Sequence, residues 1–201
     1  MKTKGKTGVV ILAAGASTRL GAQKQLLDFR GRPLLQHILD QAQPLPLAVS
    51  VLVLGAHAAE IRAAVSPGPF RVVVNEQWQE GIAGSIRVAV TEALAACPDL
   101  ENLLFLLSDQ PFVTTQILSE LLDLQTQSGL SIAACRYGGT LGVPAVFSKA
   151  MFPELLLLQG DTGAGRLIRQ HASEITALPF ESGAVDVDTE EDYRRLTGWS
   201  E

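Results

Sequence analysis

The sequence is poor in aromatic residues and in cysteine. Phe, Trp and Tyr make up only 5% of its 201 residues, and the two cysteines, Cys97 and Cys135, lie far apart in no metal-binding spacing. Such sparse cysteines indicate thiols in a reducing compartment rather than a disulfide scaffold or a zinc site. Hydrophobic residues make up 47% of the chain and charged residues 18%, so we expect a globular protein with an aliphatic core.

Positive charge is also scarce. The net charge is −5, and Lys2, Lys4 and Lys6 form the only basic cluster. Because a nucleic-acid-binding protein needs a basic surface, nucleic acid is not expected as a partner. The apolar run from Val9 to Ala14 is too short for the core of a signal peptide, and no run approaches the length of a membrane span. We therefore expect a cytoplasmic protein with no membrane partner.

Apolar runs alternate with helical patterns along the chain. Strands are expected at 9–14, 49–54, 71–74 and 103–107, where short apolar runs are bounded by turn residues. Helices are expected at 34–42 and 57–65, from Ser85 as N-cap, and after Thr114 or Thr115. Apolar strands separated by helices are typical of a parallel sheet covered on both faces. With no repeat and no linker, residues 1–201 are predicted to form one α/β domain with three layers, α/β/α, and a mainly parallel sheet.

The last third of the chain is less regular. Strands are expected at 131–135 and 145–147, with a turn at Gly138-Gly139. Thr189 followed by Asp192 three residues later predicts a capping box that opens a last short helix. The preceding stretch is strand-like, and two acidic residues alternate in it. They are Asp186 and Asp188, which we expect on one face of the chain.

The loop after the first predicted strand has the composition of an anion site. Gly15 and Gly21 allow backbone N–H groups to approach a ligand, and Arg19 and Lys24 add two cations. Ligands of open α/β sheets bind at the carboxyl ends of the strands, where this loop lies. The spacing fits neither a Walker A loop nor the Gly-x-Gly-x-x-Gly dinucleotide motif. The loop therefore predicts a triphosphate pocket, and an ordinary strand-to-helix loop is the alternative.

Asp109 follows the most apolar predicted strand, 103–107. Asp is rarely buried without a partner, and Mg²⁺ takes one or two carboxylates together with substrate phosphates. We predict that Asp109 binds Mg²⁺; a turn residue before Pro111 is the alternative. Either Asp186 or Asp188 is expected to complete the metal site, with Asp188 slightly preferred.

Seven motifs in order along the chain carry a family resemblance. They are Leu12-Ala13-Ala14-Gly15 with Ser17, Arg19, Gly21 and Lys24-Gln25-Leu26-Leu27; Gly31-Arg32-Pro33-Leu34; Asn75 with Trp78, Gly81 and Ser85; Asp109-Gln110-Pro111; Gly142 with Pro144; Gly160-Asp161 with Gly163-Ala164; and Asp186 with Asp188-Thr189. In this pattern the chain resembles the MobA-like NTP transferases, and it is most similar to their molybdenum cofactor cytidylyltransferase branch. Ala14 stands where the guanylyl branch usually has glycine.

This resemblance implies a Rossmann-like nucleotidyltransferase fold and a reaction. An NTP, with CTP preferred, would react with a molybdopterin-type acceptor carrying molybdenum, in the presence of Mg²⁺, to give molybdopterin cytosine dinucleotide and pyrophosphate. A molybdenum hydroxylase is then a possible recipient of the product. Two alternatives stay open: transfer to another phosphorylated acceptor, and a non-catalytic chaperone that delivers the finished cofactor to a hydroxylase.

The resemblance also implies roles for individual residues. The N-terminal half is expected to bind the nucleotide and the C-terminal half the acceptor. The expected catalytic residues are Lys24, Arg19 and Asp109. The expected nucleotide-binding residues are Leu12, Ala13, Ala14, Gly15, Ser17, Arg19, Lys24, Gly81 and Ser85. The expected metal ligands are Asp109 and Asp188, and the expected acceptor-binding residues are Gly142, Pro144, Asp161, Gly163 and Asp186.

Overall fold

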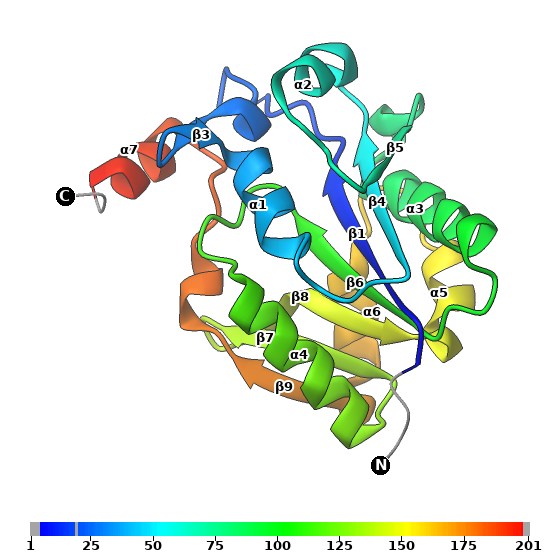
Figure 1. Ribbon diagram of the computed structural model, residues 1–201. Coiled ribbons are helices and arrows are strands. Elements are labelled where there is room, and N and C mark those ends of the chain that lie inside the picture. The colour runs from blue at the N-terminus through cyan, green and yellow to red at the C-terminus, as the bar shows by residue number, and fades with distance from the viewer. Residues whose placement is uncertain (1–4, 19, 199–201) are drawn as a thin grey trace.

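A sheet of seven strands runs through the computed structural model, which describes residues 5–18 and 20–198 (Figure 1). The strand order is β5-β4-β1-β6-β8-β7-β9. The four strands of the first half are parallel and pair in the order β5-β4-β1-β6. They are β1 (Thr7–Ala13), β4 (Val49–Leu54), β5 (Arg71–Val74) and β6 (Asn102–Leu107). All four lie where apolar runs predicted them.

The second half of the chain adds three strands. They are β7 (Ile132–Tyr137), β8 (Thr140–Ser148) and β9 (Ile175–Pro179). β8 is antiparallel to both β6 and β7, whereas β9 is parallel to β7. The predicted turn Gly138-Gly139 joins β7 to β8, and both glycines have positive φ angles, as a tight hairpin requires. The expected mainly parallel sheet is confirmed, with β8 as an antiparallel insertion.

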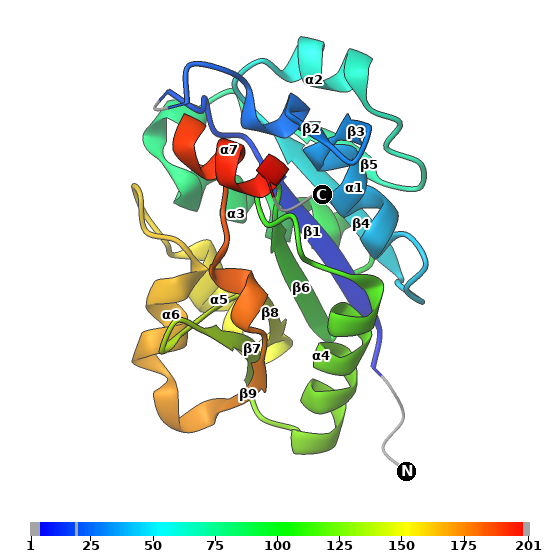
Figure 2. The same cartoon turned by 90° about the vertical axis from the view of Figure 1, so that its left-hand side faces the viewer.

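Helices cover both faces of the sheet, as Figures 1 and 2 show. One face carries α1 (Leu34–Ala42), α2 (Ala58–Ala64) and α4 (Thr115–Ser128). The other carries α3 (Ile82–Ala96), α5 (Phe152–Leu156) and α6 (Ala164–Gln170). Alternate residues of β1 belong to the two cores, because successive side chains of a strand point to opposite faces. The predicted three-layer α/β/α arrangement is confirmed.

Of the three helices for which an N-cap was predicted, two begin as expected. Thr114 caps α4, since its hydroxyl accepts the Ile117 N–H at 3.3 Å. Thr189 and Asp192 form the expected capping box, with N–H to side-chain distances of 3.2 and 2.8 Å, before α7 (Glu190–Gly198). The N-cap prediction for Ser85 was wrong.

The α3 helix begins earlier than predicted. Gly81 is its N-cap, and Ser85 is the fourth residue of the helix. The residues just before Ser85 are small, and the first turn of α3 lies close to residue 160: the Ala83 N–H donates to the Gly160 carbonyl at 3.1 Å. The start of α3 is therefore determined by a contact from the distant segment around residue 160.

Short elements complete the fold. The hairpin of β2 (Asp28–Phe29) and β3 (Arg32–Pro33) packs against α7, where the Tyr193 hydroxyl donates to the Asp28 carbonyl at 3.0 Å. The 3₁₀ turns of the described residues are η1 (Lys24–Leu26), η2 (Trp78–Glu80), η3 (Lys149–Met151), η4 (Ala172–Glu174) and η5 (Glu181–Ala184). Within the described ranges, no helix has both the length and the apolar character needed to cross a membrane.

Candidate active site

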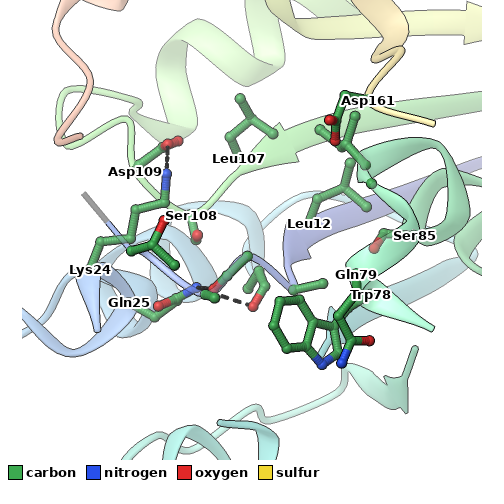
Figure 3. Close-up of a pocket in the computed structure, with 17 residues that line it drawn as sticks. Leu12, Lys24, Gln25, Trp78, Gln79, Ser85, Leu107, Ser108, Asp109 and Asp161 are labelled. Atoms are coloured by element: carbon green, nitrogen blue, oxygen red, sulfur yellow. Dashed lines mark hydrogen bonds and ion pairs between the residues drawn. The ribbon is translucent and has the colours of Figure 1, made fainter. Parts of the chain in front are cut away.

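A cavity of about 420 Å³ opens at the carboxyl ends of the adjacent parallel strands β1 and β6 (Figure 3). This is the end of the sheet where ligands of open α/β folds bind. The predicted nucleotide-binding residues that line it are Leu12, Ala13, Ala14, Gly15, Lys24, Gly81 and Ser85. Asp109 and Asp161 line it as well. Segments that are far apart in the sequence therefore share one cavity.

Lys24 forms the centre of the charged part of this cavity. Its Nζ lies 2.5 Å from Asp109 Oδ2 and 3.1 Å from Asp188 Oδ1. Burial lowers the pKa of Lys24, but the Asp109 and Asp188 carboxylates outweigh burial, so the pKa is raised above its usual value. Lys24 is accordingly a fixed positive charge at neutral pH. Among the described residues that line the cavity, it is the one cation.

Asp109 lies two residues after the end of β6, a strand in which every residue after Asn102 is apolar. The residue is only 7% exposed, and its Oδ1 is buried without a hydrogen-bond partner in the part of the chain that the structure describes. A buried carboxylate oxygen without a partner is costly unless a ligand satisfies it. Packing alone therefore does not account for Asp109.

The chain segment before α7 brings Asp188 to the same point. The expectation of a strand there was wrong, because residues 185–188 belong to no strand. Val187 is fully buried against Phe29, and its N–H donates to the Asp109 carbonyl at 3.2 Å. This anchor holds Asp188 against Lys24. Burial and the nearby Asp109 and Asp188 carboxylates raise the pKa of Asp186.

Asp109 and Asp188 together fit a divalent cation. Both carboxylates converge on the Lys24 amine, which already occupies this point as a positive charge, and Asp109 keeps one unsatisfied oxygen. Within residues 5–18 and 20–198, no group of three or more His, Cys, Asp or Glu side chains is arranged for a metal. Mg²⁺ does not need such a group, since it binds through one or two carboxylates plus substrate phosphates.

The loop after β1 contains a side chain to which the motifs assigned no role. Gln25 is 1% exposed, and its amide nitrogen donates to the Gly15 carbonyl at 3.0 Å and to the Ala13 carbonyl at 3.3 Å. Ser17 does not line the cavity; its hydroxyl accepts the Lys24 N–H at 3.2 Å. The sequence feature that could have pointed to Gln25 is its place directly after Lys24, the lysine of the glycine-containing loop. Arg19, the other predicted cation of the loop, lies outside the described residues.

The opposite wall of the cavity comes from η2 and the start of α3. Gly81 has φ 102°, and a Cβ there would lie 2.4 Å from the Gly160 carbonyl oxygen, so only glycine fits. The Ser85 hydroxyl accepts from the Asn75 amide at 3.1 Å. Trp78 packs against the core and also lines the cavity. Asp161 lies across the cavity from Lys24 (Figure 3).

The other residues predicted to bind the acceptor do not line this cavity. Gly142 and Pro144 belong to β8, where a Cβ at Gly142 would lie 2.2 Å from the Tyr137 hydroxyl oxygen. The Val143–Pro144 peptide bond is cis. Gly163 is the N-cap of α6.

The arrangement suits charge neutralisation more than nucleophilic catalysis. The charged groups among the described residues are one lysine and a cluster of carboxylates, and the other polar groups include neutral side chains such as Gln79, Ser85 and Ser108 as well as the backbone of a glycine loop. Preorganised charges of this kind stabilise charge that develops on a substrate.

Known proteins share the sequence pattern of the chain. The family model described as MobA-like NTP transferase domain matches residues 9–175. Nicotine blue oxidoreductase of Paenarthrobacter nicotinovorans is 32% identical over 196 residues, which cover 93% of this chain and 94% of that protein. The chain is also 31% identical to the bifunctional protein GlmU of Burkholderia mallei over 178 residues, but this match spans only 34% of GlmU.

Solved structures share the fold. Rv0371c from Mycobacterium tuberculosis superposes with a TM-score of 0.84 at 35% identity, and the match covers 98% of this chain and 100% of the Rv0371c chain. A structure of Rv0371c in complex with manganese superposes with a TM-score of 0.81 at 34% identity, covering 95% and 97% of the two chains.

Proposed function

Since the chain belongs to the MobA-like NTP transferase family, we propose that it transfers CMP from CTP to molybdenum-bound molybdopterin in the cytoplasm. The products are molybdopterin cytosine dinucleotide and pyrophosphate. One observation carries this function: the Lys24 amine meets the Asp109 and Asp188 carboxylates at the edge of a cavity of about 420 Å³. Small-molecule sites have volumes of about 300–1,000 Å³, so a nucleotide fits.

The chain's own groups act by positioning and by charge. An oxygen of the acceptor phosphate attacks the α-phosphorus of CTP, and the bond from that phosphorus to the bridging oxygen of the β-phosphate breaks. Pyrophosphate leaves with the electron pair and the added negative charge. Lys24, together with Arg19, stabilises this charge. The acceptor phosphate is already anionic near neutral pH, so neither a protein nucleophile nor a general base is needed.

A divalent ion completes this chemistry. We assign Asp109 and Asp188 as its protein ligands, because both carboxylates converge on one cation and Asp109 Oδ1 has no hydrogen-bond partner among the described residues. Mg²⁺ bound there would neutralise charge on the phosphate oxygens. The manganese complex of Rv0371c, a 34% identical protein, supports a divalent ion in this family.

Ala14 supports a pyrimidine base. Ala14 lines the cavity, and a Cβ added at Gly55 would come 2.9 Å from the Ala14 Cβ. The Ala14 methyl group fills space that glycine would leave empty. A pyrimidine needs less room than a purine, which favours CTP over GTP.

The acceptor is assigned to the side of the second half of the chain. Asp161 lines the cavity across from Lys24. The acceptor side is completed by Gly142, Pro144, Gly163 and Asp186. Transfer of the product to a molybdenum hydroxylase would follow release from this side.

A second candidate function is oxidation or reduction of a small substrate, because the nicotine blue oxidoreductase of P. nicotinovorans is 32% identical over 93% of this chain. A redox enzyme would oxidise NADH or NADPH with a coloured acceptor, which absorbance at 340 nm follows. Nucleotidyl transfer predicts no such oxidation. The first loop has no Gly-x-Gly-x-x-Gly dinucleotide motif, which favours the transferase.

Pyrophosphate release tests the proposed function. The protein is incubated with CTP, GTP, ATP or UTP and Mg²⁺, with and without molybdenum-bound molybdopterin. We expect release only with the acceptor and fastest with CTP. Release with a sugar phosphate instead would support another acceptor, and tight CTP binding without any release would support a cofactor-delivery chaperone. Either result contradicts the proposed reaction.

A further inference from the structure

We propose that Gln25 is a positioning residue that holds the loop between β1 and η1 in the conformation that binds a triphosphate. Gln25 has this role only if the chain binds a nucleoside triphosphate, as proposed above. A glutamine that is 1% exposed needs partners for both ends of its amide, because unpaired buried polar atoms are costly. Gln25 finds these partners at the end of β1 and in the loop that follows it.

The amide nitrogen of Gln25 joins two carbonyls of the loop. It donates to Gly15 at 3.0 Å and to Ala13 at 3.3 Å, so its two N–H groups are directed at backbone oxygens two residues apart (Figure 3). These oxygens lie where β1 ends, beyond the last residue that pairs with β6. Beyond the end of the β1–β6 pairing, the Gln25 amide therefore donates the hydrogen bonds that a neighbouring strand would otherwise give to the Ala13 and Gly15 carbonyls.

Fixing a carbonyl also fixes the next N–H group. In a trans peptide the C=O of one residue and the N–H of the next point in opposite directions. With the Gly15 carbonyl directed at Gln25, the Ala16 N–H points away from Gln25, and Ala16 lines the cavity. A Cβ added at Gly15 would meet no atom within 4 Å, so the space beside the loop is open to a ligand. Backbone N–H groups in such a loop bind phosphate oxygens.

The other end of the amide reaches the catalytic lysine. Gln25 Oε1 accepts a hydrogen bond from the Ser17 hydroxyl at 3.4 Å, and Ser17 Oγ accepts the Lys24 N–H at 3.2 Å. Ser17 has φ 55°, a conformation that most L residues avoid, so it needs such partners. One side chain thus orients the loop peptides and the backbone of Lys24 together, without touching the cavity's charged groups.

A matched control exists at the other end of the sheet. Gln125 in α4 is 7% exposed, and its amide nitrogen donates to the Leu130 carbonyl at 2.8 Å. It lies beside Thr7 at the beginning of β1. Gln125→Leu and Gln25→Leu both remove a buried amide that is bonded to backbone carbonyls. Gln25→Leu affects the carboxyl end of β1, where the cavity lies, whereas Gln125→Leu affects the opposite end of the sheet.

The test compares the two variants by thermal unfolding and by binding of Mg²⁺–CTP. Both variants should have a lower Tm. Only Gln25→Leu should raise the Kd for CTP, by about tenfold, and lower kcat. Without the Gln25 hydrogen bonds, the backbone N–H groups of the loop no longer point at the phosphate oxygens, so they stabilise the transition-state charge less. CTP affinity equal to that of the wild type in Gln25→Leu, or an equal loss in Gln125→Leu, would overturn the role of Gln25. Absence of CTP binding by the wild type would instead overturn the proposed function.

A second variant keeps the size of the side chain in case Gln25→Leu does not fold. In Gln25→Glu, an ionised carboxylate faces two carbonyl oxygens and cannot donate to them, whereas the protonated acid can donate to one. The ratio of variant to wild-type Kd for CTP should therefore fall severalfold between pH 8 and pH 5.5. A ratio that is independent of pH would contradict the assigned hydrogen bonds.

Discussion

The Lys24 amine lies 2.5 Å from the Asp109 carboxylate although 85 positions separate the two residues along the chain. They meet because β1 and β6 are neighbours in the sheet and both loops leave its carboxyl end. Asp188 completes the group at 3.1 Å from the same amine. The lysine therefore occupies the point at which the proposed Mg²⁺ would lie. We expect the triphosphate to draw Lys24 away and the metal to take its place.

Removing either partner should reduce turnover strongly. Lys24→Ala and Asp109→Ala are each expected to lower kcat by about 10²–10³-fold, the effect of losing one transition-state contact. Pyrophosphate release from CTP measures this effect, and circular dichroism checks that the variants fold. Near wild-type turnover in a folded variant would remove that residue from the mechanism.

Metal affinity without nucleotide should rise when the lysine loses its charge. In Lys24→Met, Asp109 and Asp188 lose the cation between them, and a divalent ion no longer competes with it. Titration with Mn²⁺, followed by electron paramagnetic resonance, should show at least about tenfold tighter binding than in the wild type. Lys149→Met is the control, because Lys149 pairs with Glu101 on the exposed surface. Unchanged Mn²⁺ affinity in Lys24→Met would show that the carboxylates do not form the metal site.

Nucleotide preference should shift when the methyl group of Ala14 is removed. Ala14→Gly removes a methyl group from a residue that lines the cavity, so kcat/KM for GTP relative to CTP should rise by about tenfold, the usual effect of one methyl group in a pocket. Ala16→Gly removes a methyl group from the same loop and should leave the ratio unchanged. Equal ratios in both variants and the wild type would exclude residue 14 as the source of base preference.

Gly81 should tolerate no side chain. Gly81→Ala combines φ 102° with a Cβ 2.4 Å from the Gly160 oxygen, and we expect a loss of about 3 kcal/mol or more in the free energy of unfolding. Gly139 also has positive φ, but a Cβ there meets no atom within 4 Å. Gly139→Ala should cost only about 1 kcal/mol. Denaturant unfolding measures both, and equal losses would mean that the contact with Gly160 is not tight.

Stability should depend on pH through His171. Its ring lies 2.9 Å from a Glu154 carboxylate oxygen and 3.2 Å from one of Glu174, and these two hydrogen bonds raise the pKa of His171. A raised pKa in the folded state means that the stabilisation is complete below the unfolded pKa of about 6.5 and disappears as the pH rises through the folded pKa.

The difference in unfolding free energy between wild type and His171→Gln should therefore be larger at pH 5.5 than at pH 9. Solvent screening at this exposed site keeps the difference below about 1 kcal/mol. Chemical denaturation at the two pH values measures it. A difference that grows with pH would have the wrong sign for these ion pairs.

Local patterns were enough to predict the parallel half of the fold. The strands β1, β4 and β6 are buried on both faces, so their sequences are continuous apolar runs that a single reading of the chain detects. The Thr114 cap and the Thr189–Asp192 capping box were predictable for the same reason, since each depends on residues within one turn.

Features that depend on distant contacts were not predictable in this way. β9 is half-buried at the edge of the sheet, so Ile175–Pro179 has no continuous apolar run. The start of α3 depends on the contact between Ala83 and Gly160. Gln25 belongs to a motif of the sequence, but the motif does not say what it does, because its partners are backbone carbonyls, which every residue type has.

A crystal structure of the protein with CTP and Mg²⁺ would show whether nucleotide and metal meet at Lys24 and Asp109. We predict the triphosphate in the cavity beside Gly15, the Lys24 amine moved from Asp109 to a phosphate oxygen, and the metal on Asp109 and Asp188. CTP bound elsewhere, or bound in the cavity while Lys24 still holds both carboxylates and no metal lies between them, would contradict it.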